Sequence, residues 1–154
     1  MVLMNVKLNN VYTFNGFELN FSYPRRIAHS TIPHEHLDGF PNFRYKKLNI
    51  IMGNNATGKT VLGKLLDLVF KAITEEDISY LYDVPLLDET KEGMVSIDFV
   101  PDGDNLYRMV FRIDRTRRQR FVGFNIVSTK TTKRDNYETA ANRLDKQNHL
   151  IKMI

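Results

Sequence analysis

Alternation of apolar and polar residues predicts strands in the first third of the chain. Residues 2–8 are rich in apolar side chains, and in residues 17–23 aromatic or aliphatic residues alternate with polar ones, the period of a half-buried strand. Residues 46–52 end in the apolar run Leu-Asn-Ile-Ile-Met, which predicts a buried strand. Residues 24–45 contain three prolines and a glycine without a clear period, so we expect a long loop insertion there.

A helical spacing follows. Apolar residues recur every three or four positions from about Lys59 to Ile73 and would share one helix face; they are Leu62, Leu65, Leu66, Val69 and Ile73. Thr74 and Asp77 are candidate caps of a second, short helix that reaches about Tyr82. The tail 136–154 carries a weak apolar stripe and predicts a last helix.

Between these helices the period changes to that of strands. Residues 94–100, 105–114 and 120–128 are expected to form antiparallel strands, and Asp102-Gly103 is a hairpin signal in the first connection. One face of this sheet would be lined by Val95, Ile97, Phe99, Tyr107, Met109, Phe111 and Ile113.

Composition bounds the class of protein. The 154 residues suffice for one domain, 1–154, and 42% apolar with 26% charged residues is ordinary for a globular protein. The chain contains no cysteine, which excludes disulfides and thiolate zinc sites. No apolar run approaches the roughly 20 residues that span a bilayer, and the start of the chain does not resemble a signal peptide. We therefore expect a cytoplasmic protein without a membrane partner.

The predicted strand at 46–52 and the helix after it flank a complete Walker A motif, G-x-x-x-x-G-K-[ST], at Gly53–Thr60. Its two glycines allow the backbone N–H groups to turn inward toward phosphate oxygens. Lys59 would reach the β- and γ-phosphates of ATP, and the Thr60 hydroxyl would ligate Mg²⁺. The residues expected to bind MgATP are Gly53, Asn54, Asn55, Ala56, Thr57, Gly58, Lys59, Thr60 and Val61.

The loop reads Gly-x-Asn-x-x-Gly-Lys-Thr and resembles the loops of ABC-type AAA ATPase heads of the SMC, RecF and OLD-like groups. The resemblance covers about residues 2–128. It implies an α/β fold, a P-loop NTPase core with an antiparallel β subdomain that corresponds to the N-terminal half of such a head. It also implies ATP hydrolysis in DNA-related processes, with the rest of the site supplied by a second copy or by a C-terminal half-head partner.

The sequence departs from that family in its catalytic motifs. It has neither the L-S-G-G-x signature nor a Walker B run that ends in Asp-Glu. The nearest apolar runs end at Asp98 and Asp114, each interrupted by a polar residue, and are better interpreted as ordinary antiparallel strands. No catalytic residue is therefore assigned. The alternative function is a non-catalytic, nucleotide-responsive interaction module.

Positive charge is concentrated between Arg108 and Arg134, where nine Lys or Arg residues accompany one acid. Four of them are expected at a hairpin tip: Arg115, Arg117, Arg118 and Arg120. They would either contact nucleic-acid phosphates or protect a solvated sheet edge. The pair His34 and His36 is interpreted as part of a solvated loop rather than as a metal site, because His-x-His alone has low specificity.

Overall fold

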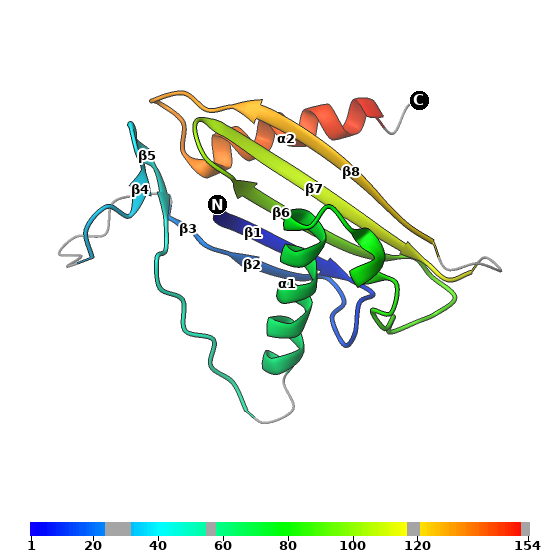
Figure 1. The fold of residues 1–154 in the computed structure, drawn as a ribbon. Coiled ribbons are helices and arrows are strands. Elements are labelled where there is room, and N and C mark those ends of the chain that lie inside the picture. The colour runs from blue at the N-terminus through cyan, green and yellow to red at the C-terminus, as the bar shows by residue number, and fades with distance from the viewer. Residues whose placement is uncertain (24–31, 55–57, 117–120, 152–154) are drawn as a thin grey trace.

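The computed structural model describes residues 1–23, 32–54, 58–116 and 121–151. Its centre is a five-stranded sheet in the order β2-β1-β6-β7-β8, and every pairing in it is antiparallel. The strands are β1 (Val2–Asn9), β2 (Phe17–Asn20), β6 (Gly93–Val100), β7 (Asn105–Asp114) and β8 (Phe121–Lys130). Helix α1 (Lys59–Thr74) crosses one face of this sheet and α2 (Tyr137–Ile151) covers the other (Figure 1).

The alternation along the strands divides the apolar residues between these two faces. On the α1 side, the face predicted from Val95, Ile97 and Phe99 together with alternate residues of β7 is confirmed, because all of them belong to one apolar cluster with α1. The α2 side holds a second cluster that includes Leu106 and Leu144. A register shift between Leu3 and Asn5 directs Met4 to this second cluster, while Val6 stays in the first.

Helix α1 follows the predicted spacing closely. Its buried residues are Leu62, Leu65, Val69 and Ala72, and the helix ends at Thr74. The short helix predicted after it is the 3₁₀ helix η1 (Ile78–Leu81), and the Asp77 carboxylate caps it by accepting a hydrogen bond of 2.8 Å from the Ser79 N–H. Within the described part of the chain, no helix combines the length and the apolar character needed to cross a membrane.

A second, smaller sheet lies where a loop insertion was expected. Its order is β3-β5-β4, and its strands are β3 (Ser22–Tyr23), β4 (His36–Leu37) and β5 (Phe40–Tyr45). The strand predicted at 17–23 is therefore divided between two sheets, with the buried Phe21 at the division. Periodicity did not indicate β4 and β5, because strands of two and six residues carry too few alternations to stand out.

The expected P-loop NTPase core is not what this chain forms. Such a core is a parallel α/β sheet, whereas all pairings among the described strands here are antiparallel. The buried strand predicted at 46–52 is also wrong. Residues 48–54 form neither helix nor strand, and Leu48 is 68%, Ile50 74% and Met52 85% exposed. A buried parallel strand needs a neighbour on each side, and the described residues supply none.

Candidate phosphate-binding site

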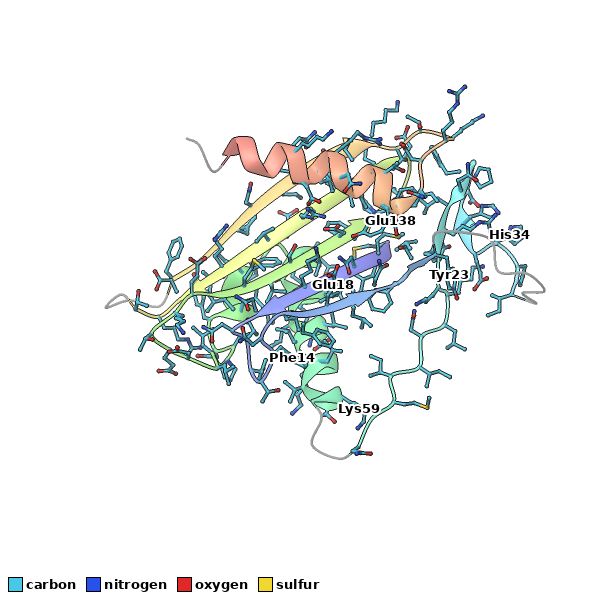
Figure 2. The ribbon with its side chains drawn as sticks, turned by 180° about the vertical axis from the view of Figure 1, so that it is seen from behind. Phe14, Glu18, Tyr23, His34, Lys59 and Glu138 are labelled. Atoms are coloured by element: carbon cyan, nitrogen blue, oxygen red, sulfur yellow. The ribbon has the colours of Figure 1, made fainter. Side chains whose placement is uncertain are left out.

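The Walker A motif joins the extended segment 48–54 to the first turn of α1. The ammonium group of Lys59 donates hydrogen bonds of 2.7 Å to the carbonyl oxygens of both Gly53 and Asn54. These bonds draw the two ends of the loop together around the lysine. Figure 2 shows Lys59 at the end of α1 that faces the extended segment. Three of the expected site residues, 55–57, lie outside the described residues.

Gly58 connects the loop to the helix in a conformation that favours glycine. Its φ is +85°, in the left-handed region, and an added Cβ would come within 3.1 Å of Cζ of Phe14. Phe14 is held in place by the Val11–Phe14 bridge and by an aromatic contact with Phe17 at 4.9 Å between ring centroids. The second glycine of the motif is therefore required both by backbone geometry and by this packing.

The first turn of α1 has the electrostatic character of an anion site. The first helical hydrogen bond runs from the Leu62 N–H to the Gly58 carbonyl at 2.8 Å, so the N–H groups of Lys59, Thr60 and Val61 precede it. The turn contains no acidic residue, and no side chain caps it. Thr60 is exposed beside Lys59. The positive charge of Lys59 and the positive end of the helix dipole therefore lie at the same end of α1.

Asp98 ends one of the two apolar runs that were compared with a Walker B motif, and it lies on the opposite face of the sheet from α1. It is 2% exposed and accepts two hydrogen bonds of 2.7 Å from Arg108 and one of 2.6 Å from the Tyr137 hydroxyl. Arg108 also contacts Asp145 of α2. Burial is the largest influence and acts to lower the pKa of Arg108, but the hydrogen bonds and negative charges of Asp98 and Asp145 together hold that pKa above the ordinary value. Burial, followed by the charge of Asp98, raises the pKa of Tyr137.

This buried network fastens α2 to the sheet and was missed from the sequence. A signal for it existed in the Asp102-Gly103 turn. The turn fixes the register of β6 and β7, and in that register Asp98 is the cross-strand partner of Arg108. Asp114, the other Walker B-like acid, accepts hydrogen bonds from the N–H and hydroxyl of Thr116 and closes a turn at the end of β7. The interpretation of both segments as ordinary antiparallel strands is confirmed.

Arg115 does not extend from an exposed hairpin tip. Its guanidinium donates to the carbonyl oxygens of Tyr82 at 3.1 Å and Val84 at 2.6 Å, and its side chain is 15% exposed. The other three arginines proposed for nucleic acid, Arg117, Arg118 and Arg120, lie outside the described residues. The arginine before Arg115, Arg112, pairs with Glu92 at 3.1 Å.

The two histidines lie close together. The ring centroids of His34 and His36 are 6.3 Å apart, and Nδ1 of His36 lies 3.0 Å from the Leu37 carbonyl oxygen. No group of three or more metal-ligating side chains gathers anywhere in the described ranges. His36 begins strand β4, so this segment is partly ordered as sheet instead of being a simple loop.

Comparisons of the chain with protein-family models, with curated proteins and with solved structures find no match. Its function has to be argued from its own residues and their geometry.

Proposed function

We propose that this chain binds MgATP through Gly53–Val61. The observation that carries the proposal is the position of Lys59. Its ammonium group is held by two loop carbonyls beside the first turn of a helix that has no acid and no side-chain cap. A complete Walker A motif at the same residues supports a nucleoside triphosphate as the anion.

Different groups of the loop and helix would bind different parts of MgATP. Backbone N–H groups of the loop and of the first turn of α1 would donate to phosphate oxygens. Lys59 would exchange its bonds to the Gly53 and Asn54 carbonyls for bonds to the β- and γ-phosphates. The exposed Thr60 hydroxyl would be an oxygen ligand of Mg²⁺, which prefers oxygen donors and keeps several waters. Gly58 and Phe14 would keep the loop in register with the helix.

The proposal is for binding and does not extend to efficient turnover by this chain. Hydrolysis requires an oriented water and stabilisation of charge opposite the loop. Asp98 is committed to Arg108 and Tyr137 behind the sheet, and Asp114 to Thr116. A partner, either a second copy or another segment, would have to bring the missing groups if the complex is an ATPase.

The exposed segment beside the loop favours the second candidate, a nucleotide-responsive interaction module. Ile50 and Met52 are 74% and 85% exposed and immediately precede Gly53. A phosphate bound at Gly53 would restrain the end of this segment, so the nucleotide would control an apolar surface that a partner contacts. Nucleic acid remains a proposed partner through Arg117, Arg118 and Arg120, without Arg115.

The test is titration calorimetry of MgATP with the wild-type chain and with Lys59→Ala. The substitution removes a charged donor, so we expect binding to weaken by roughly 1.5–3 kcal/mol, which is about 10- to 150-fold. Lys64→Ala is the matched control, because Lys64 is an exposed lysine of the same helix beyond its first turn. It should bind as the wild type does.

Two outcomes would contradict the proposal. One is no heat of binding with the folded wild-type chain. The other is equal loss of affinity in the Lys59 and Lys64 variants, which would indicate a diffuse charge effect instead of a phosphate-binding loop. Thermal melts of all three proteins would establish that each is folded at the temperature of the titration.

A further inference from the structure

Strand β8 is the last strand of the main sheet in the described part of the chain. It pairs with β7 along all ten of its residues, from Phe121 to Lys130, without a register shift. On its other side, no strand among the described residues pairs with it. In Figure 1 it forms the upper border of the sheet, with α2 behind it.

This edge lacks the features that normally keep sheet edges apart. Edge strands are usually short, bulged, or protected by charged residues and proline. Residues 121–129 include neither a charged residue nor a proline, and the ladder to β7 is regular. The first charged residue is Lys130 at the end of the strand, where it pairs with Asp104 at 3.3 Å.

The strand also exposes two large apolar side chains on one face. Phe124 is 55% exposed and Ile126 is 44% exposed. Both alternate in phase with Val122, which belongs to the apolar cluster on the α1 side, and Phe124 lies against Phe111 at 6.3 Å between ring centroids. The apolar surface of that cluster therefore continues outward to the open edge.

We propose that two copies of this chain associate through β8, antiparallel about a two-fold axis, so that their five-stranded sheets become continuous. A two-fold interface brings the same patch of both copies together, and an antiparallel strand pair has this symmetry. Residues 121–129 carry no charge, so pairing them with the same residues of a second copy brings no like charges together. A charged partner would form no ion pair with these residues.

The side chains select the register. Centring the pair on Asn125 places Phe124 opposite Ile126 of the second copy, and by symmetry this contact forms twice on the α1 face. Aromatic and β-branched residues in direct cross-strand positions are a favourable combination. The two Asn125 residues then face each other on the axis, where each amide can donate to the other and accept from it.

The absence of cysteine from the chain makes this register directly testable. Asn125→Cys would place the two introduced thiols in opposite positions, where Cα separations of about 4.5–5.5 Å suit a disulfide. Ser128→Cys is the matched control on the same strand. In this register it faces Val122 of the second copy, so its two thiols are separated by six residues, or about 20 Å. Mild oxidation should give a covalent dimer with Asn125→Cys and monomer with Ser128→Cys.

Light scattering at micromolar concentration supplies the second readout. The wild-type chain should be dimeric, and Phe124→Lys combined with Ile126→Lys should be monomeric and still show a cooperative thermal melt. Phe124→Lys combined with Ile126→Glu should restore the dimer, because the register then opposes unlike charges. A monomeric wild-type chain, or equal cross-linking at positions 125 and 128, would overturn the proposal. None of these measurements involves nucleotide.

Discussion

At Gly58 a single residue links backbone conformation, packing and the proposed site. Its positive φ and its contact with Phe14 make any side chain unfavourable there. Gly58→Ala should lower the free energy of unfolding by about 1–2 kcal/mol, the cost of a left-handed alanine, and should also weaken MgATP binding. Urea denaturation would measure the first effect and calorimetry the second.

Gly63 provides the opposite case on the same helix. It lies in the interior of α1, and an added Cβ would meet nothing within 4 Å. Gly63→Ala should therefore stabilise the protein by about 0.5–1 kcal/mol, the difference between glycine and alanine in a helix. A destabilising Gly63→Ala would contradict the open surroundings of Gly63, and an unchanged free energy of unfolding in Gly58→Ala would show that the positive φ at Gly58 does not require glycine.

Single residues also mark the limits of prediction from sequence. The motif identified Lys59 and Thr60, but nothing near Arg115 indicated that it would bind the Tyr82 and Val84 carbonyls. That contact depends on how the segment after η1 returns to the end of β7. The density of charge along the sequence therefore shows that the segment is basic. It does not show which of the cationic side chains are accessible.

Among the elements, α2 is held at its start by an ion pair whose strength depends on pH. Asp135 accepts hydrogen bonds from Arg143 at 2.9 and 2.7 Å and from the Thr132 N–H at 2.7 Å. Arg143 is the largest cause that lowers the pKa of Asp135 to about 2. Because the pKa is lower in the folded state than the roughly 3.9 of an unfolded aspartate, the stabilisation is complete above about pH 5. It is lost as the pH falls toward 2.

The measurement is the free energy of unfolding at several pH values between 7 and 2, with Asp135→Asn as the comparison. The wild-type advantage should be constant above about pH 5 and should shrink toward pH 2. Asp88, whose pKa is also lowered to about 2 by its hydrogen bonds to Thr90, acts equally in both proteins and cancels in the difference. A difference that does not change with pH would show that the ion pair contributes no net stability.

The elements that the sequence predicted well share a strong period. Helix α1 and strands β6 and β7 each present a regular apolar face, and these faces pack together in one cluster as expected. Residues 48–52 are also mostly apolar, but they belong to no strand and are exposed. The apolar side chains of a segment show that it could be buried. Whether other segments lie close enough to bury it depends on the three-dimensional fold.

For the whole molecule, the same contrast explains why a Walker A motif can be present in the sequence although the fold that the resemblance implied is wrong. A Walker A motif consists of glycines, a lysine and a threonine that are close together in the sequence, so it can be recognised from the sequence alone. A parallel core is a relation among strands far apart in the chain. Here β1 pairs antiparallel with the central strand, β6, and α1 packs across them without any strand from 46–52.

This arrangement makes a prediction that separates the observed fold from a parallel core. Ile50→Ser should change the free energy of unfolding of the monomer by no more than about 0.5 kcal/mol, because a substitution on an exposed and unpaired segment removes little buried surface. Ile97→Ser is the control, since Ile97 is fully buried in β6. It should cost about 2–5 kcal/mol through the lost apolar contacts and the buried hydroxyl. Urea denaturation of both variants, at a concentration where light scattering finds monomer, gives the comparison.

An Ile50 substitution as costly as that of Ile97 would show that residues 48–52 are buried in solution, and the correction from a parallel to an antiparallel fold would then fail for this segment.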